Sequence, residues 1–319
     1  MIKEAFVDRR SALAAAALAV TLAMTPTGAI AAPVEPTSPD YAVGRRDVVL
    51  VDSTRPTAPD PRGTPGRPDR TIPVRLLYPA SGAPGGPVTD QPRSAPGVFP
   101  LVVFSHGVTA TGPAYEQLVA YIAQSGYVVA LPTYPLTSGP GARIDDYVNQ
   151  PADVSFIIDS VLAMARDRHD PLFGHVHRFK IAAAGHSLGA ITTVGVTYHE
   201  AVRDSRIDAA VALAGAELGF PGGDYLPRPG IPLHLVHGAN DATVPVGFSD
   251  SMYANATGPA TYLRLHTAGH IDLFFPPAGE LTIGSTVAFL DAYVKHRPQA
   301  LRAVPKQVAA TGLGTWQQK

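Results

Sequence analysis

The feature that most constrains the fold is a glycine-flanked serine between an apolar run and a helix-like stretch. Residues 185–189 read Gly-His-Ser-Leu-Gly; they follow the run Lys-Ile-Ala-Ala-Ala at 180–184 and precede the stretch 190–199. A serine at such a strand-to-helix turn has a strained backbone, and small neighbours let two chain segments pass closely. The sequence therefore predicts that the Ser187 hydroxyl projects from a sheet at a helix N-terminus, where negative charge is stabilised.

Two further polar side chains follow later predicted strands. Asp241 comes shortly after the apolar segment 233–237, and His270 comes shortly after the segment 262–265. A serine on this kind of turn is followed in the chain by an acid and then by a histidine, and parallel strands gather such groups at their carboxyl ends. Each residue taken alone is more often an ordinary turn or loop residue. Their order, intervals and strand contexts together predict a catalytic triad of Ser187, Asp241 and His270.

A fourth part of the predicted site follows the buried-strand pattern at 99–104. The next residues are Ser-His-Gly-Val, ending at Val108. An oxyanion hole on this scaffold needs the amide of the residue after the nucleophile and one amide from the loop after an early strand. We therefore expect the amides of Leu188 and Val108 to form it, with Gly107 allowing the loop to bend. His106 is expected to pack and hydrogen bond inside the loop.

These segments resemble the α/β-hydrolase superfamily. Within it they look like the dienelactone-hydrolase-like branch, which includes platelet-activating-factor acetylhydrolases and bacterial cutinase-type polyester hydrolases. The resemblance covers roughly residues 43–296 and includes 71–80, similar to a strand and Tyr-Pro-Ala turn of that branch. It implies a serine hydrolase that uses the triad named above and no cofactor. The polyester hydrolases usually have an aromatic residue where this chain has Val108, so simple ester hydrolysis is favoured over polyester cleavage.

Alternation and helical periodicity predict an α/β fold with a mostly parallel eight-stranded sheet and helices on both faces. The first two strands are expected to form an antiparallel edge. Strands are predicted near 43–51, 72–78, 100–105, 127–132, 179–184, 208–214, 232–237 and 260–266, and helices near 113–125, 150–167, 188–200, 245–254 and 281–296.

Only the segment 215–231, rich in proline and glycine, separates the sixth and seventh predicted strands. It is too short for a helical lid, so no large cap domain is expected and the active site is predicted to be an open cleft. The segments 108–115 and 271–277 are expected to wall it. Phe274 and Phe275 are the candidate substrate-binding residues, on the acyl or the alcohol side. Simple packing under the loop is the alternative for both.

The first residues, 1–31, read as a signal peptide. Lys3, Arg9 and Arg10 precede an apolar run at 11–24, which is too short to cross a bilayer comfortably. An Ala-Ile-Ala cleavage motif then predicts cutting between Ala31 and Ala32. The protein is therefore expected to be secreted, extracellular or periplasmic, with no membrane span after cleavage. A retained N-terminal anchor is the alternative.

The remaining chain is expected to contain a linker at 32–42, a catalytic domain at 43–297 and a C-terminal tail at 298–319. A net charge of −1 does not favour nucleic acid or an anionic membrane surface as partner. The chain has no cysteine, which excludes disulfides, a lipoprotein anchor and thiolate metal sites. The expected partner is a small-molecule or lipid ester substrate, and the sequence leaves the oligomeric state open.

Three alternatives to ester hydrolysis follow from the same residues. The triad could serve another acyl transfer, such as thioester or amide hydrolysis, transesterification or phospholipid deacylation. A non-catalytic binding protein on this scaffold is disfavoured because such proteins usually lose a triad residue. A metal hydrolase could use His169, Asp170, His175 and His177, but these read as a polar loop before a strand with no further ligand evident. No metal is therefore expected.

Overall fold

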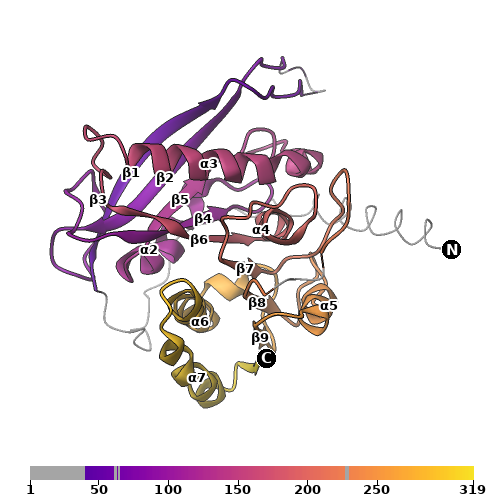
Figure 1. Cartoon of the computed structure of the whole chain (residues 1–319). Helices are drawn as coiled ribbons and strands as arrows, with labels where there is room; N and C mark the ends of the chain where they lie inside the picture. The colour runs from indigo at the N-terminus through magenta and orange to yellow at the C-terminus, as the bar shows by residue number, and fades with distance from the viewer. Residues whose placement is uncertain (1–39, 61–62, 64, 227–229) are drawn as a thin grey trace.

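The computed structural model describes residues 40–60, 63, 65–226 and 230–319. A ten-stranded sheet with the order β10-β9-β8-β7-β6-β4-β5-β2-β1-β3 runs through the molecule, with helices on both faces (Figure 1). The predicted signal peptide at 1–31 and most of the predicted linker at 32–42 lie outside the described residues. Within the described ranges, no helix is long and apolar enough to span a membrane.

The strands are β1 (Ala42–Asp52), β2 (Arg70–Ala80), β3 (Thr89–Asp90), β4 (Phe99–Ser105), β5 (Val128–Pro132), β6 (Val176–His186), β7 (Ala209–Leu213), β8 (Leu233–Gly238), β9 (Ala260–Leu265) and β10 (Gly314–Gln318). The α-helices are α2 (Glu116–Gln124), α3 (Gln150–Met164), α4 (Leu188–Tyr198), α5 (Gly247–Asn255), α6 (Ala278–Tyr293) and α7 (Val304–Thr311). Short 3₁₀ helices are η2 (Gly112–Tyr115), η3 (Ile144–Asn149), η4 (Asp272–Phe274) and η5 (Pro298–Ala303).

The centre of the sheet is parallel and its flanks are antiparallel. Strands β5, β4, β6, β7, β8 and β9 pair in parallel. On one side β2 pairs antiparallel with both β5 and β1, as predicted for the first two strands, and on the other side β10 pairs antiparallel with β9. The parallel strands therefore end at one edge of the sheet, where the loops after β4, β6, β8 and β9 meet.

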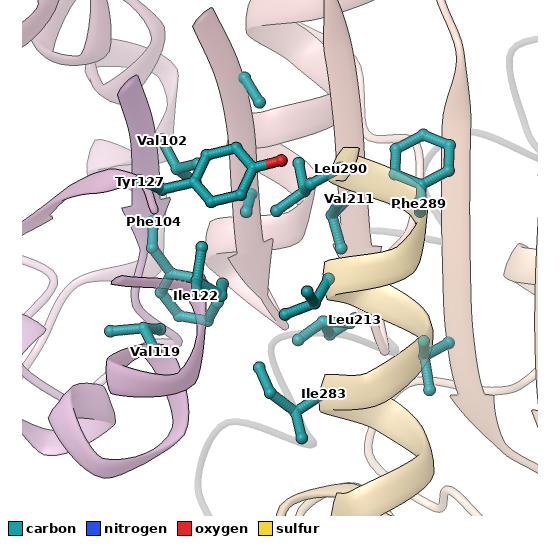
Figure 2. Packing of buried hydrophobic residues seen from close by; sticks show 14 of the residues in the cluster. Val102, Phe104, Val119, Ile122, Tyr127, Val211, Leu213, Ile283, Phe289 and Leu290 are labelled. Atoms are coloured by element: carbon teal, nitrogen blue, oxygen red, sulfur yellow. The ribbon is translucent and has the colours of Figure 1, made fainter. Parts of the chain in front are cut away.

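Alternating residues of the central strands supply hydrophobic clusters on both faces of the sheet, as expected for a sheet that is buried on both faces. Val102 and Phe104 of β4 pack in the cluster that also holds residues of α2, α6 and α7, whereas Leu101 and Val103 pack in the cluster that holds residues of α3. Figure 2 shows the first of these clusters, in which α2 and α6 cover the same face of the sheet. Its labelled side chains are Val102, Phe104, Val119, Ile122, Tyr127, Val211, Leu213, Ile283, Phe289 and Leu290.

The sheet is larger than the eight strands predicted. Both additions, β3 and β10, are short edge strands whose existence depends on pairing with distant residues. The segment 298–319, predicted as a tail, contains η5, α7 and β10, and Gly314–Gln318 pairs with Thr261–Leu265. Val304 and Val308 of α7 are buried in the same core as α6. This segment therefore belongs to the folded unit and closes one edge of the sheet.

The connection between β7 and β8 agrees with the expected lack of a cap. Residues 214–226 and 230–232, the described part of that connection, contain no helix. Phe220 from this loop packs with Leu188 and Ile191 of α4. The loop therefore lies against the N-terminal turn of α4 and forms a wall beside it.

A buried ion network fastens β2 to α3. Nε of Arg70 lies 2.7 Å from Oδ1 of Asp153, and Nη2 of Arg70 lies 2.7 Å from Oδ2 of Asp146. Arg70 and Asp153 are fully buried, and Arg55 reaches the same Asp153 oxygen at 2.8 Å. Burial raises the pKa of Asp153, while hydrogen bonds and charges from Arg70 and Arg55 act against that rise.

Candidate active site

Ser187 occupies the turn between β6 and α4 that the sequence predicts. Its backbone has φ 54° and ψ −119°, a positive φ that non-glycine residues rarely adopt, and its amide donates to the carbonyl of Leu213 at 2.9 Å. The turn requires small neighbours, because a Cβ at Gly185 would lie 2.3 Å from the carbonyl oxygen of Gly189. The serine therefore sits on a strained, closely packed turn at the first residue before a helix.

Asp241 and His270 form a hydrogen-bonded pair. Nδ1 of His270 donates to Oδ2 of Asp241 at 2.7 Å, across the loops that follow β8 and β9. Because Nδ1 is the donor, Nε2 of the neutral imidazole has its lone pair free. The pair therefore has the geometry of a base and the carboxylate that orients it.

The Asp241 carboxylate is held ionised by its surroundings. Oδ1 accepts the amides of Thr243 and Val244, both at 2.8 Å, and Oδ2 also accepts Nε2 of His237 at 3.1 Å. Burial acts to raise the pKa of this carboxyl group. The hydrogen bonds from His237, His270 and the Val244 amide outweigh burial and hold the pKa well below its ordinary value.

The loop after β4 and the loop after β9 both meet the serine turn. A Cβ at Gly107 would lie 3.3 Å from Cβ of Ser187, so the predicted oxyanion loop passes directly beside the serine. On the other side, Nε2 of His186 lies 3.1 Å from the carbonyl oxygen of His270, and the two rings are 4.7 Å apart between centroids. Two segments that are distant in sequence thus converge on Ser187 and its preceding residue.

The two predicted oxyanion residues pack together. The side chains of Val108 and Leu188 belong to one apolar cluster beside α4, and Leu188 is the first residue of that helix. The amide of a first helical residue has no partner within its helix, so it can donate to a ligand. Ser187 is 8% exposed, so the residue is mostly buried beside Val108 and Leu188 but reaches the surface.

His106 hydrogen bonds inside its loop, as expected, and also to the segment after β5. Its Nε2 accepts the amide of Tyr134 at 3.0 Å, so Nδ1 carries the proton and donates to the carbonyl of Gly107 at 2.7 Å. Burial lowers the pKa of His106 to about 4, which keeps it neutral. This histidine therefore holds the loop after β4 against the segment that contains Tyr134.

The two candidate substrate-binding phenylalanines differ in their surroundings. The Phe274 ring meets the His186 ring edge-on at 4.6 Å and the Tyr115 ring at 5.6 Å, and it packs against the core between the sheet and α6. These contacts favour the packing role for Phe274. Phe275 is 47% exposed, and its role in lining the cleft stays a prediction.

Sequence reasoning missed three residues around the site: His186, His237 and Tyr115. His186 is the variable position of the serine motif, and Tyr115 lies far away in sequence, yet Oη of Tyr115 lies 2.8 Å from Nδ1 of His186. The one available signal was for His237, which precedes Asp241 by four residues at the end of a buried strand.

Three of the four residues weighed as metal ligands have other partners for their side chains. The Asp170 carboxylate binds the Arg46 guanidinium at 2.8 Å, and Nδ1 of His175 lies 2.9 Å from the carbonyl oxygen of Gly97. Nδ1 of His177 accepts the amide of Phe179 at 3.2 Å. Among the described residues, no group of three or more histidine, aspartate or glutamate side chains is arranged to hold a metal ion.

A solved structure matches this architecture over most of both chains. It is a ferulic acid esterase from Streptomyces cinnamoneus, with a TM-score of 0.58 and 23% sequence identity, and the match covers 83% of this chain and 93% of that chain. Together with the sheet order and the serine turn, it defines the class of fold: the protein has the α/β-hydrolase fold. The predicted fold class is confirmed.

A narrower relationship comes from a sequence profile. The profile of the Chlorophyllase family matches residues 75–216, which is less than half of the chain. None of the curated proteins compared with the chain matches it. Membership of the dienelactone-hydrolase-like branch therefore stays a prediction.

Proposed function

We propose that the protein is a serine hydrolase that cleaves carboxylic esters through an acyl-enzyme intermediate. Ser187 is the nucleophile, His270 the base and Asp241 the acid, and the amides of Val108 and Leu188 form the oxyanion hole. The observation that carries this proposal is the 2.7 Å hydrogen bond from Nδ1 of His270 to Asp241, in a loop that meets the strained serine turn.

The mechanism follows from the proton positions. Nε2 of His270 accepts the Ser187 proton as the hydroxyl oxygen attacks the ester carbonyl. Asp241 stabilises the imidazolium that forms, and its low pKa keeps it negatively charged throughout. The two amides stabilise the tetrahedral oxyanion, and His270 then protonates the leaving alcohol. Water repeats the same steps on the acyl-enzyme and releases the acid.

The substrate class is a small-molecule or lipid ester that reaches the serine from an open side. The described part of the connection between β7 and β8 contains no helix that could cover the carboxyl ends of the strands. Apolar residues of that loop and of α4 form a cluster beside the serine turn, and Val108 and Leu218 are partly exposed members of it. An ester with an apolar acyl or alcohol group fits these surroundings. Ferulic acid esters should also be tested, because the solved structure with the same fold is a ferulic acid esterase.

The decisive experiment compares the native enzyme with Ser187→Ala. We expect the substitution to remove hydrolysis of nitrophenyl esters, by up to about 10⁶-fold in turnover, and to abolish labelling by a serine-directed organophosphate. Hydrolysis by Ser187→Ala at the native rate would refute the proposal. Rates across acyl chains from acetate to palmitate, on acyl thioesters, on anilides and on methyl ferulate then identify the preferred bond and chain length.

We also propose that the mature protein is secreted after cleavage between Ala31 and Ala32. The charged start, the apolar run and the Ala-Ile-Ala motif support this. N-terminal sequencing of protein recovered from outside the cytoplasm should begin at Ala32. An intact N-terminus on membrane-bound protein would instead support a retained anchor.

A further inference from the structure

A chain of hydrogen bonds joins three loops around the proposed nucleophile. The amide of Gly107 donates to Oη of Tyr115 at 3.2 Å. The same hydroxyl lies 2.8 Å from Nδ1 of His186, the residue before the serine. Nε2 of His186 lies 3.1 Å from the carbonyl oxygen of His270. The chain therefore runs from the residue before Val108 to the backbone of the proposed base.

The direction of each hydrogen bond is fixed by the groups involved. A carbonyl oxygen can only accept, so Nε2 of His186 carries the proton and donates to His270. Nδ1 of His186 then accepts the hydroxyl proton of Tyr115, whose oxygen accepts from Gly107. Burial raises the pKa of Tyr115 to about 12 and lowers that of His186 far below its ordinary value, so both groups keep these protonation states.

Aromatic packing also holds the rings of Tyr115 and His186 in place, in addition to these hydrogen bonds. The Tyr115 ring lies 5.1 Å from the Phe104 ring and meets Phe274 edge-on, while His186 contacts Phe274 on its own side. The hydroxyl of Tyr115 thus joins the Gly107 amide to the His186 ring inside an aromatic cluster. Its removal would leave two buried groups, the Gly107 amide and Nδ1 of His186, without that partner.

We propose that Tyr115 and His186 are positioning residues that set the backbone of His270 and the Gly107 turn relative to Ser187. The inference rests on the proposed function. Asp241 fixes the His270 imidazole through Nδ1, and His186 fixes the backbone that carries this imidazole, so the ring has two anchors. Through Gly107, the same link holds the oxyanion loop against the serine. Small displacements of such groups reduce turnover because catalysis requires aligned reacting atoms.

The first test is Tyr115→Phe, which removes one oxygen atom and keeps the ring. We expect kcat for a nitrophenyl ester to fall about tenfold with KM unchanged, the effect of losing one buried hydrogen bond at the transition state. Active-site titration with the same ester normalises kcat to folded enzyme. The matched control is Tyr78→Phe, which removes a buried hydroxyl that donates to Pro92 in another part of the sheet, and kcat should not change.

The second test is a double-mutant cycle with His186→Phe. If the two residues act through one chain of bonds, the double variant loses little more activity than His186→Phe alone. Multiplicative losses would overturn the inference, as would a Tyr115→Phe enzyme with native kcat or with a raised KM only. These outcomes are separable from failure of the proposed function, because Ser187→Ala tests that function independently.

Discussion

A Cβ atom at Gly189 would lie 2.0 Å from the carbonyl oxygen of Ser105. The first turn of α4 therefore packs directly on the end of β4, with backbone against backbone and no space for a side chain. Ser105 precedes the predicted oxyanion loop, so this contact sets the distance between that loop and the serine turn.

Gly189→Ala should consequently damage both stability and activity. No flexible side chain can yield to the added methyl group, so we expect a loss of at least about 1–3 kcal/mol in the free energy of unfolding and a large fall in ester hydrolysis. Urea denaturation and nitrophenyl ester assays measure the two effects. Gly284→Ala in α6 is the control: nothing lies within 4 Å of the added atom, and helix propensity predicts a gain of up to about 1 kcal/mol.

Asp241→Asn should preserve the fold and remove most activity. The asparagine can still accept the amides of Thr243 and Val244 through its oxygen, but its NH₂ group would face Nδ1 of His270 and favour the wrong tautomer. We expect kcat to fall by about 10⁴-fold. Asp145→Asn, at an exposed carboxylate that pairs with Arg143, serves as control. A native turnover number for Asp241→Asn would show that Asp241 is not the acid of the triad.

Arg70→Met should destabilise the protein strongly. It removes the shared partner of Asp146 and Asp153 and leaves Asp153 fully buried with only Arg55 nearby. Breaking a buried ion pair in this way costs about 3–5 kcal/mol. The matching surface substitution, Arg143→Gln, should cost no more than about 1 kcal/mol because its carboxylate partner is exposed. If urea denaturation showed equal losses of unfolding free energy for the two substitutions, the buried ion network would not be a major source of stability.

Acid should unfold the protein through its buried histidines. Burial lowers the pKa of His106 to about 4 and that of His234 to about 3, against 6.5 for the free side chain. The unfolded chain therefore binds more protons below pH 6.5, and stability falls as the pH drops from 6.5 towards these values. Each histidine contributes a slope of up to about 1.4 kcal/mol per pH unit.

His234→Gln tests this contribution, because glutamine has no titration in that range. Its unfolding free energy, measured by urea denaturation between pH 7 and pH 5, should depend less steeply on pH than that of the native protein. Gly284→Ala, which changes no titratable group, should leave the slope unchanged. Identical slopes for all three proteins would show that His234 is not a source of the acid sensitivity.

The sequence predicted the architecture because the central strands and the serine turn depend on local pattern. Gly185 and Gly189 identify the turn before any contact is known, and Asp241 and His270 follow strands whose apolar character is plain. Edge strand β10 was missed because Gly-Thr-Trp-Gln-Gln has no clear alternation, and its pairing with β9 depends on residues about fifty positions away.

The residues that surround the proposed triad were harder to predict. His237 reads as one of two histidines in a buried strand, and only the structure shows its Nε2 beside Asp241. Tyr115 and His186 are separated by 71 positions, and their contact exists because η2 and the serine turn meet at the same edge of the sheet. Sequence spacing can indicate which strand ends converge, but it does not show which side chains then touch.

The position of β10 has a consequence for engineering the chain. From β10 to β1 there are eight strand-to-strand steps across the sheet, or roughly 38 Å at the usual spacing. Gln318 and Ala42 both lie at the edge where the parallel strands begin, because β10 is antiparallel to β9 and β1 runs in the direction of β5. A peptide that joined them along this edge would need about a dozen extended residues. Circular permutation therefore requires a connector of at least this length, because a short loop would not cover the width of the sheet.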